Sequence, residues 1–99
     1  MPPHTHPLMT LRASTGHPVE IALVAVPGAG VKWHAPPVPA DCTIEEAAPE
    51  PLDEGIGGST RQRFLVTVST PGVRELTFEY RRPWEPVVRA VQPVVLDVR

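Results

Sequence analysis

The sequence predicts an all-β domain, an immunoglobulin-like β-sandwich of about seven or eight strands. Short segments of alternating apolar and polar residues recur along the chain, and turn residues separate them at intervals of about 8 to 12 residues. Fourteen prolines are spread through the 99 residues, which excludes long helices because proline lacks a backbone donor and clashes with the preceding turn. Trp33 follows soon after a core strand, as in immunoglobulin-like sandwiches.

Length and composition indicate one domain with its own hydrophobic core. The chain is 41% hydrophobic with a net charge of −2, which is typical of a folded domain and not of a disordered segment. Its nine basic residues are outnumbered by eleven acidic ones, so we expect no nucleic-acid partner. The single cysteine, Cys42, has no partner for an internal disulfide and is predicted to be a buried thiol, compatible with a reducing compartment.

The N-terminal residues predict a loose leader at 1–7, followed by the folded domain at 8–99. The leader holds three prolines and two histidines without periodicity, and its folding onto the first strand stays open. It lacks the basic and apolar segments of a secretory signal, and no stretch approaches the roughly 18 apolar residues of a membrane span. The chain as given is therefore expected to be cytoplasmic, monomeric and without a membrane partner, while a longer natural N-terminus would leave export open.

Four strands are predicted in the first half of the chain, at residues 8–12, 19–26, 31–34 and 42–47. The second is the clearest, because every other residue is apolar and points to one face: Val19, Ile21, Leu23 and Ala25. Ser14-Thr15-Gly16 predicts a turn, and three prolines within 35–40 predict a crossing between the sheets. Residues 48–60 are rich in proline, glycine and acids and predict a long exposed loop.

Three more strands are predicted in the second half, at residues 61–69, 73–81 and 90–98. Their inward faces should carry Phe64, Val66 and Val68; Leu76, Phe78 and Tyr80; and Val94, Leu96 and Val98. Thr70-Pro71-Gly72 predicts a hairpin between the first two of these strands. Pro93 predicts an edge or a bulge in the last strand, because it cannot donate to a ladder.

Three loop motifs occur in a fixed order: Val26-Pro27-Gly28-Ala29-Gly30-Val31-Lys32-Trp33, Gly55-Ile56-Gly57-Gly58 and Arg82-Pro83-Trp84-Glu85. Over residues 17–98 the sequence resembles the chagasin-type inhibitors of papain-like cysteine proteases. That family carries Asn-Pro-Thr-Thr-Gly with an aromatic, one residue and Trp, then Gly-x-Gly-Gly, then Arg-Pro-Trp. The second and third motifs are intact here. The first departs from the family at Val26, Gly28, Ala29 and Val31.

The resemblance implies a reversible, competitive inhibitor that inserts three loops into the active-site cleft of a papain-like cysteine protease. The implied protease-binding residues are Pro27, Gly28, Ala29, Gly30, Gly55, Ile56, Gly57, Gly58, Arg82, Pro83 and Trp84. It implies no catalytic residue, cofactor or metal. In the family the second threonine lies nearest the protease catalytic residues, so alanine at position 29 predicts weaker inhibition.

Elementary chemistry supports this mode of binding. Glycine-rich loops enter a narrow cleft without side-chain clashes, and an aromatic residue between prolines is held out at low entropic cost. Trp84, between Pro83 and Pro86, therefore has the character of an interface anchor, and Arg82 is suited to pair with a carboxylate beside the cleft.

Other interpretations of the same residues remain open. Trp33 is expected in the core, Trp84 would be structural if it folded back over the sandwich, and the glycine-rich motif lacks the Gly-Lys-Ser/Thr of a phosphate loop. Zinc or cysteine-histidine chemistry is not predicted, because no known spacing matches the five residues that would supply it: His4, His6, His17, His34 and Cys42. The alternative function is a non-inhibitory immunoglobulin-like protein-binding module.

Overall fold

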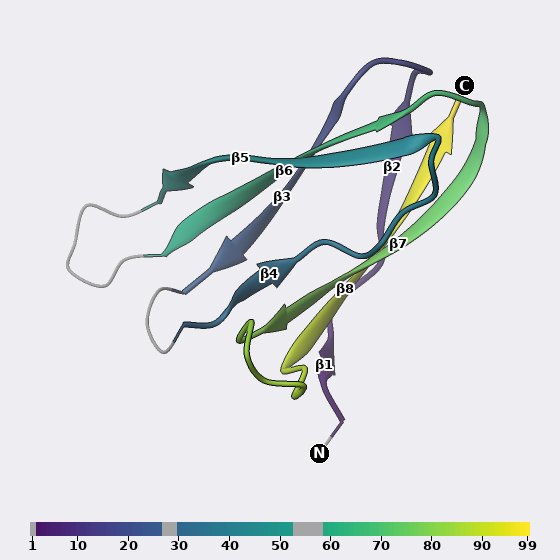
Figure 1. The fold of residues 1–99 in the computed structure, drawn as a ribbon. Helices are drawn as coiled ribbons and strands as arrows, with labels where there is room; N and C mark the ends of the chain where they lie inside the picture. The colour runs from purple at the N-terminus through teal and green to yellow at the C-terminus, as the bar shows by residue number, and fades with distance from the viewer. Residues whose placement is uncertain (1, 27–29, 53–58) are drawn as a thin grey trace.

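The protein is a sandwich of two β-sheets (Figure 1). The computed structural model describes residues 2–26, 30–52 and 59–99. Eight strands and no helix occur in these described residues, which confirms the predicted immunoglobulin-like sandwich. Within the same ranges, nothing helical is long and apolar enough to cross a lipid bilayer.

The larger sheet has the order β1-β8-β7-β4, and β2 also pairs with β8. Its strands are β1 (His4–Thr5), β2 (Met9–Ala13), β4 (Lys32–His34), β7 (Gly72–Arg81) and β8 (Ala90–Val98). The smaller sheet has the order β3-β6-β5, with β3 (Val19–Ala25), β5 (Cys42–Pro51) and β6 (Thr60–Val68). The strands β1 and β2 run parallel to β8, and all other pairs are antiparallel.

The core lies between the sheets and uses the inward faces that the alternating pattern predicted. Phe64 of β6 and Phe78 of β7 pack across the interface with ring centroids 4.9 Å apart. Trp33 is 3% exposed and belongs to the same core, as expected, whereas Tyr80 is only partly buried. The other large buried side chains are Ile21, Leu23, Val66, Val68, Leu76, Val94, Leu96 and Val98.

The predicted hairpin after residue 69 is wrong, because β6 and β7 belong to different sheets. The turn at Thr70-Pro71-Gly72 carries the chain from one layer to the other. The alternating pattern shows only that the apolar residues of both strands face one core. That holds whether the two strands pair in a hairpin or lie in two facing sheets. The turn signal was correct, and the strand pairing that it was taken to imply was not.

The N-terminal segment contains β1, although residues 1–7 were expected to be a loose leader or to fold onto the first strand; β1 pairs with β8 instead. The amide of His4 donates to the carbonyl of Arg89 at 3.0 Å, and the amide of His6 donates to that of Val91 at 3.0 Å. Pairing through the backbone needs no apolar pattern, so the sequence carried no signal for this strand.

Pro93 was expected at an edge or bulge, but β8 is an interior strand. Since the carbonyl of Val91 accepts from His6, the nitrogen of Pro93, two residues on, faces the same side. There the N-terminal segment passes from β1, which pairs as far as Val91, to β2, which begins opposite Val94. The missing N–H therefore faces a gap between two strands, and the ladder to β7 keeps all its donors.

The expected loop at residues 48–60 is shorter, because β5 continues to Pro51 and β6 begins at Thr60. The register shifts between Ala47 and Glu50, after which Glu50 lies opposite Arg61. The strand β5 is an edge strand, so its prolines cost no ladder bond on the free side. The composition pointed to a loop because prolines are depleted from strands in general.

Asp41, which directly precedes β5, joins the two layers of the sandwich. Its carboxylate accepts a hydrogen bond from the Thr70 hydroxyl at 2.5 Å and forms an ion pair with Arg74 of β7. Its carbonyl accepts from the Ser69 amide at 2.9 Å. The hydrogen bond from Thr70, helped by Arg74, holds the pKa of the Asp41 carboxyl below its ordinary value of 3.8.

This cluster predicts part of the acid sensitivity of the fold. A carboxyl with a lowered folded-state pKa stabilises the protein above its ordinary pKa of 3.8, and that stability is lost as pH falls through the folded-state value. Asp41→Asn is therefore expected to lower the melting temperature at pH 6 more than at pH 2.5, and Thr70→Ala should act in the same direction. Equal losses at both pH values would contradict this role.

Candidate functional site

The strand register brings three connections to one end of the sandwich (Figure 1). In the smaller sheet Ala25, where β3 ends, lies opposite Thr60, and Thr60 lies opposite Pro51. In the larger sheet Lys32 of β4 lies opposite Arg81 of β7. The neighbouring residue of β7, Tyr80, lies opposite Ala90, where β8 begins. The ends that flank all three predicted loop motifs are thus neighbours, although the motifs are more than twenty residues apart in sequence.

The structure describes four of the eleven predicted site residues: Gly30, Arg82, Pro83 and Trp84. The others lie outside the described residues: Pro27, Gly28, Ala29, Gly55, Ile56, Gly57 and Gly58. The four described residues come from two connections, β3–β4 and β7–β8, and they meet through Gly30 and Trp84.

Trp84 is 69% exposed and does not fold back over the sandwich. The far edge of its ring lies against Gly30, where an added Cβ atom would be 2.6 Å from Cη2. Gly30 has φ +74°, a conformation that side-chain-bearing residues rarely adopt. The contact joins the first and third motifs and leaves most of the indole surface open to a partner.

Arg82 holds the turn that carries Trp84. Its guanidinium pairs with Glu85 at 2.9 Å, and the Glu85 amide donates to the Arg82 carbonyl at 3.2 Å. Arg89 reaches the other Glu85 oxygen at 3.9 Å. The sequence suggested a pairing of Arg82 with a protease carboxylate, whereas within the chain this arginine braces its own loop.

Two aromatic residues that the sequence placed only in the core also support the first motif. The Tyr80 hydroxyl accepts from the Val26 amide at 3.2 Å and donates to the Val26 carbonyl at 3.3 Å. The Trp33 indole N–H donates to the Val24 carbonyl at 2.9 Å. The polar atom of a tyrosine or tryptophan that packs against a core needs a hydrogen-bond partner. The positions of Tyr80 and Trp33 near strand ends were therefore the available sign that they hold the adjoining loop.

Gln62 is the supporting residue that the sequence analysis missed. It is 6% exposed, on the inward face of β6. Its Oε1 accepts from the Trp33 amide at 2.7 Å, and its Nε2 donates to the Trp33 carbonyl at 3.2 Å and to Glu46 at 3.3 Å. Residues 62, 64, 66 and 68 alternate onto the inward face of β6, where a glutamine is unusual. Its place in that series was the sign in the sequence that Gln62 makes buried hydrogen bonds.

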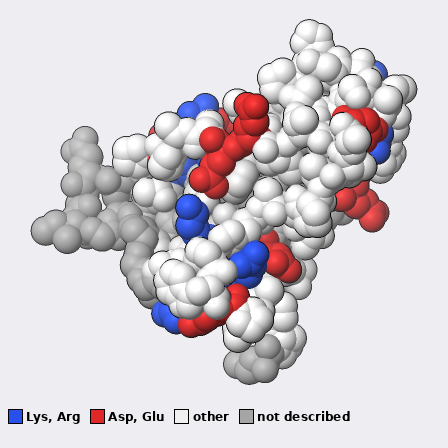
Figure 2. All heavy atoms as spheres, viewed as in Figure 1, with Lys and Arg blue, Asp and Glu red and all other residues white. Residues whose placement is uncertain are grey.

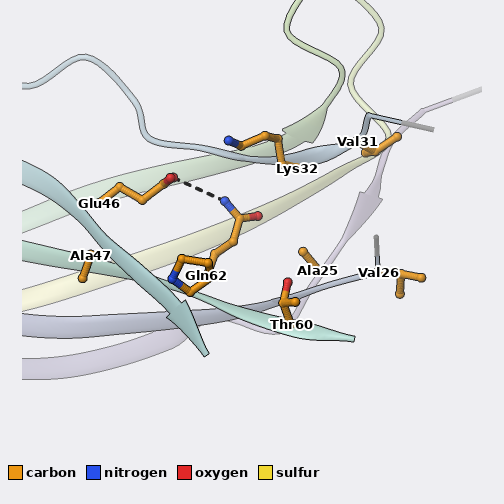
Figure 3. Close-up of a pocket in the computed structure, with 9 residues that line it drawn as sticks. Ala25, Val26, Val31, Lys32, Glu46, Ala47, Thr60 and Gln62 are labelled. Carbon is orange, nitrogen blue, oxygen red and sulfur yellow. Dashed lines mark hydrogen bonds between the residues drawn. The ribbon is translucent and has the colours of Figure 1, made fainter. Parts of the chain in front are cut away.

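A pocket of about 180 Å³ opens beside Gln62 (Figure 3). Lys32 of β4 and Glu46 of β5 lie on its walls, and the Glu46–Gln62 hydrogen bond crosses it. The lining residues are Ala25, Val26, Val31, Lys32, Glu46, Ala47, Pro49, Thr60 and Gln62. The pocket therefore lies at the same end as the three connections and separates the edges of the two sheets.

On the face shown in Figure 2, the described surface has no large area of purely positive or purely negative charge. Acidic and basic side chains alternate with broad uncharged areas. Several of the arginines are paired with carboxylates, as Arg63 is with Glu20 and Arg61 is with Glu50 at 2.8 Å. The described surface in this view therefore has no extended area of one charge that would attract an oppositely charged partner.

The residues weighed for metal or nucleophilic chemistry do not form one cluster. His6 lies between His4 and Trp33, with ring centroids 4.9 and 5.5 Å away, and His34 hydrogen-bonds the Arg81 carbonyl. Among the described residues no group of three or more metal-binding side chains gathers. Cys42 is buried, as predicted, and burial raises the pKa of its thiol, which disfavours a nucleophilic thiolate.

Together, the sandwich and the three connections at one end are typical of a protein that binds a partner through its loops. Comparison with known families gives the more specific assignment. Residues 12–98 match the chagasin family peptidase inhibitor I42, and the chain belongs to this family. The family and the function predicted from the three motifs, protease inhibition, are confirmed. Its members are inhibitors, not enzymes.

Solved structures share the fold over nearly the whole chain. PbICP-C, in complex with falcipain-2, has a TM-score of 0.68 at 19% identity, covering 98% of this chain and 91% of that chain. The cysteine protease inhibitor EhICP2 from Entamoeba histolytica has a TM-score of 0.67 at 18% identity, covering 100% of both chains. Amebosin has a TM-score of 0.66 at 23% identity, covering 99% of this chain and 100% of that chain. No curated protein sequence matches this chain.

Replacing Gln62 by leucine is expected to cost about 2 to 4 kcal/mol of folding stability, since it leaves the buried amide and carbonyl of Trp33 without partners. Urea unfolding measures the loss. Gln92→Leu is a matched control, because Gln92 is equally buried but bonds Pro7 at the β1–β2 junction. Both variants should lose stability, and only Gln62→Leu should shift the indole signal of Trp33. An unshifted Trp33 signal would contradict the proposed support of the first loop.

Proposed function

We propose that this protein inhibits papain-like cysteine proteases by inserting the loops of the three motifs into the active-site cleft, reversibly and in competition with substrate. The observation that carries the proposal is the contact of Trp84 with Gly30 at the end where all three connections emerge. It couples two of the motifs into one surface. Membership of a peptidase inhibitor family supplies the general function.

The partner class is supported by the solved relatives. PbICP-C forms a complex with falcipain-2, and EhICP2 is a cysteine protease inhibitor. The same fold in this chain, with intact second and third motifs, supports a protease of that class as its partner.

The physical basis is preorganisation. Trp84 leaves 69% of its surface in solvent, and burying a large aromatic against a partner is strongly favourable. The turn that carries it is braced by the Arg82–Glu85 pair, and the start of the first loop is held by Tyr80. Little conformational freedom remains to be lost in these parts when a protease binds. Such a wedge needs neither a nucleophile nor a cofactor.

Titration against a panel of papain-like proteases tests the proposal. Inhibition should follow competitive kinetics, activity should return on dilution, and the inhibitor should remain uncleaved after prolonged incubation. Serine proteases serve as the comparison and should be spared, because their clefts differ in shape. A covalent adduct or steady consumption of the protein would refute the mechanism. Tight binding without inhibition would favour the non-inhibitory module.

Trp84→Ala is expected to weaken inhibition by roughly 30- to 1000-fold, equivalent to about 2 to 4 kcal/mol, because a central aromatic anchor is lost. The melting temperature should hold, since the side chain is largely exposed. Val73→Ala is the matched control: Val73 is 67% exposed but lies at the opposite end of β7. If both variants inhibit like the wild type, Trp84 is not an anchor.

The first motif yields a gain-of-function prediction. Gly28 and Ala29 stand where the family has two threonines, and each missing hydroxyl removes a hydrogen bond typically worth about 0.5 to 1.5 kcal/mol. Glycine also adds chain freedom that binding must freeze. The double replacement by threonine should strengthen inhibition roughly 10-fold. A fall in affinity with an unchanged melting point would show that the loop is adapted to a differently shaped cleft.

A further inference from the structure

We propose that Gly30 is a positioning residue, whose lack of a side chain sets the direction in which Trp84 projects. The inference deepens the proposed function and rests on it only for its effect on protease binding. Its basis is a steric relation between two residues 54 positions apart in the chain, one within the first motif and one in the third.

The six-membered ring of Trp84 occupies the space that a side chain at position 30 would need. A Cβ atom built on Gly30 would lie 2.6 Å from Cη2 and 3.4 Å from both Cζ2 and Cζ3. Carbon atoms in contact prefer about 3.5 to 4.0 Å, so the first of these distances is a clash. The indole therefore rests directly on the peptide backbone of residue 30.

Such a clash would be relieved by a movement of the Trp84 side chain more than by a movement of the backbone that carries it. The Arg82–Glu85 ion pair and the Glu85 amide hydrogen bond hold the turn, whereas the 69% exposed ring can adopt another side-chain rotamer at a smaller energetic cost. A methyl group at position 30 would thus turn Trp84 away from its present direction and leave the sandwich intact. The expected consequence falls on binding more than on stability.

Gly16 provides a matched control for the backbone contribution. Its φ is +75°, against +74° for Gly30, but a Cβ atom there would meet nothing within 4 Å. It lies in the β2–β3 turn at the other end of the sandwich, where its amide donates to Val68. Alanine at either position pays the same left-handed strain. Only at position 30 does it also displace Trp84.

The first experiment uses the protein without a protease. The chain has two tryptophans, and Trp84→Ala assigns their indole N–H signals in a nitrogen-proton correlation spectrum. Gly30→Ala should shift the Trp84 signal and change the quenching of Trp84 fluorescence by acrylamide. Gly16→Ala should leave both unchanged while losing a similar amount of melting temperature. An unmoved Trp84 signal in Gly30→Ala would overturn the inference whatever the protein inhibits.

The second experiment is a double-mutant cycle read as inhibition constants. Gly30→Ala should weaken inhibition of a papain-like protease about 10-fold, and its effect should be at least about 5-fold smaller in the Trp84→Ala background. Equal effects in both backgrounds would overturn the link between Gly30 and protease binding through Trp84. If no protease is inhibited by the wild type, the proposed function fails, and the spectroscopic arm still decides whether Gly30 positions Trp84.

Discussion

The pairing of the Gln62 side chain with the backbone of Trp33 is the interaction on which the proposed binding end of this protein depends. Sheet edges that face the interior need partners for their amides and carbonyls, and β4 is a short edge strand. Gln62 supplies one acceptor and one donor to the same residue, as a neighbouring strand would, but from the opposite sheet. A single buried side chain thereby joins the two layers below the first loop, and its third bond, to Glu46, extends the link to β5.

The supports of the loops form a connected set above this link. The Trp33 ring fixes the end of β3 through the Val24 carbonyl, and it packs against Tyr80, with centroids 5.0 Å apart. The Tyr80 hydroxyl then holds Val26. The third loop is braced separately by its own ion pair and meets the first at Gly30. Rigid strands that carry loops of small residues suit the proposed insertion into a cleft. Such loops lose little conformational freedom when they bind.

The strands were predictable from the sequence wherever burial on one face imposed a period of two, as in β3, β6, β7 and β8. The three motifs were also recognisable, because they are short sequence patterns that resemble those of a known family. The roles of Gln62 and Arg82 could not be predicted. A glutamine in an inward phase shows that some partner must exist without saying which. Arg82 could pair within or beyond the chain, and only its distance to Glu85 identifies the internal partner.

The sequence by itself determined the all-β class, the core-facing residues and the family, since each depends on local alternation or on short motifs. Tertiary structure alone decided that β6 and β7 face each other across the core, that β1 lies beside β8, and that Pro93 faces a gap. It also decided that Gly30 and Trp84 touch. The physical reason is the same in each case. Alternation specifies which side of a strand is buried, whereas strand neighbours and contacts between loops are set by backbone hydrogen bonds and by shape, which many sequences satisfy equally well.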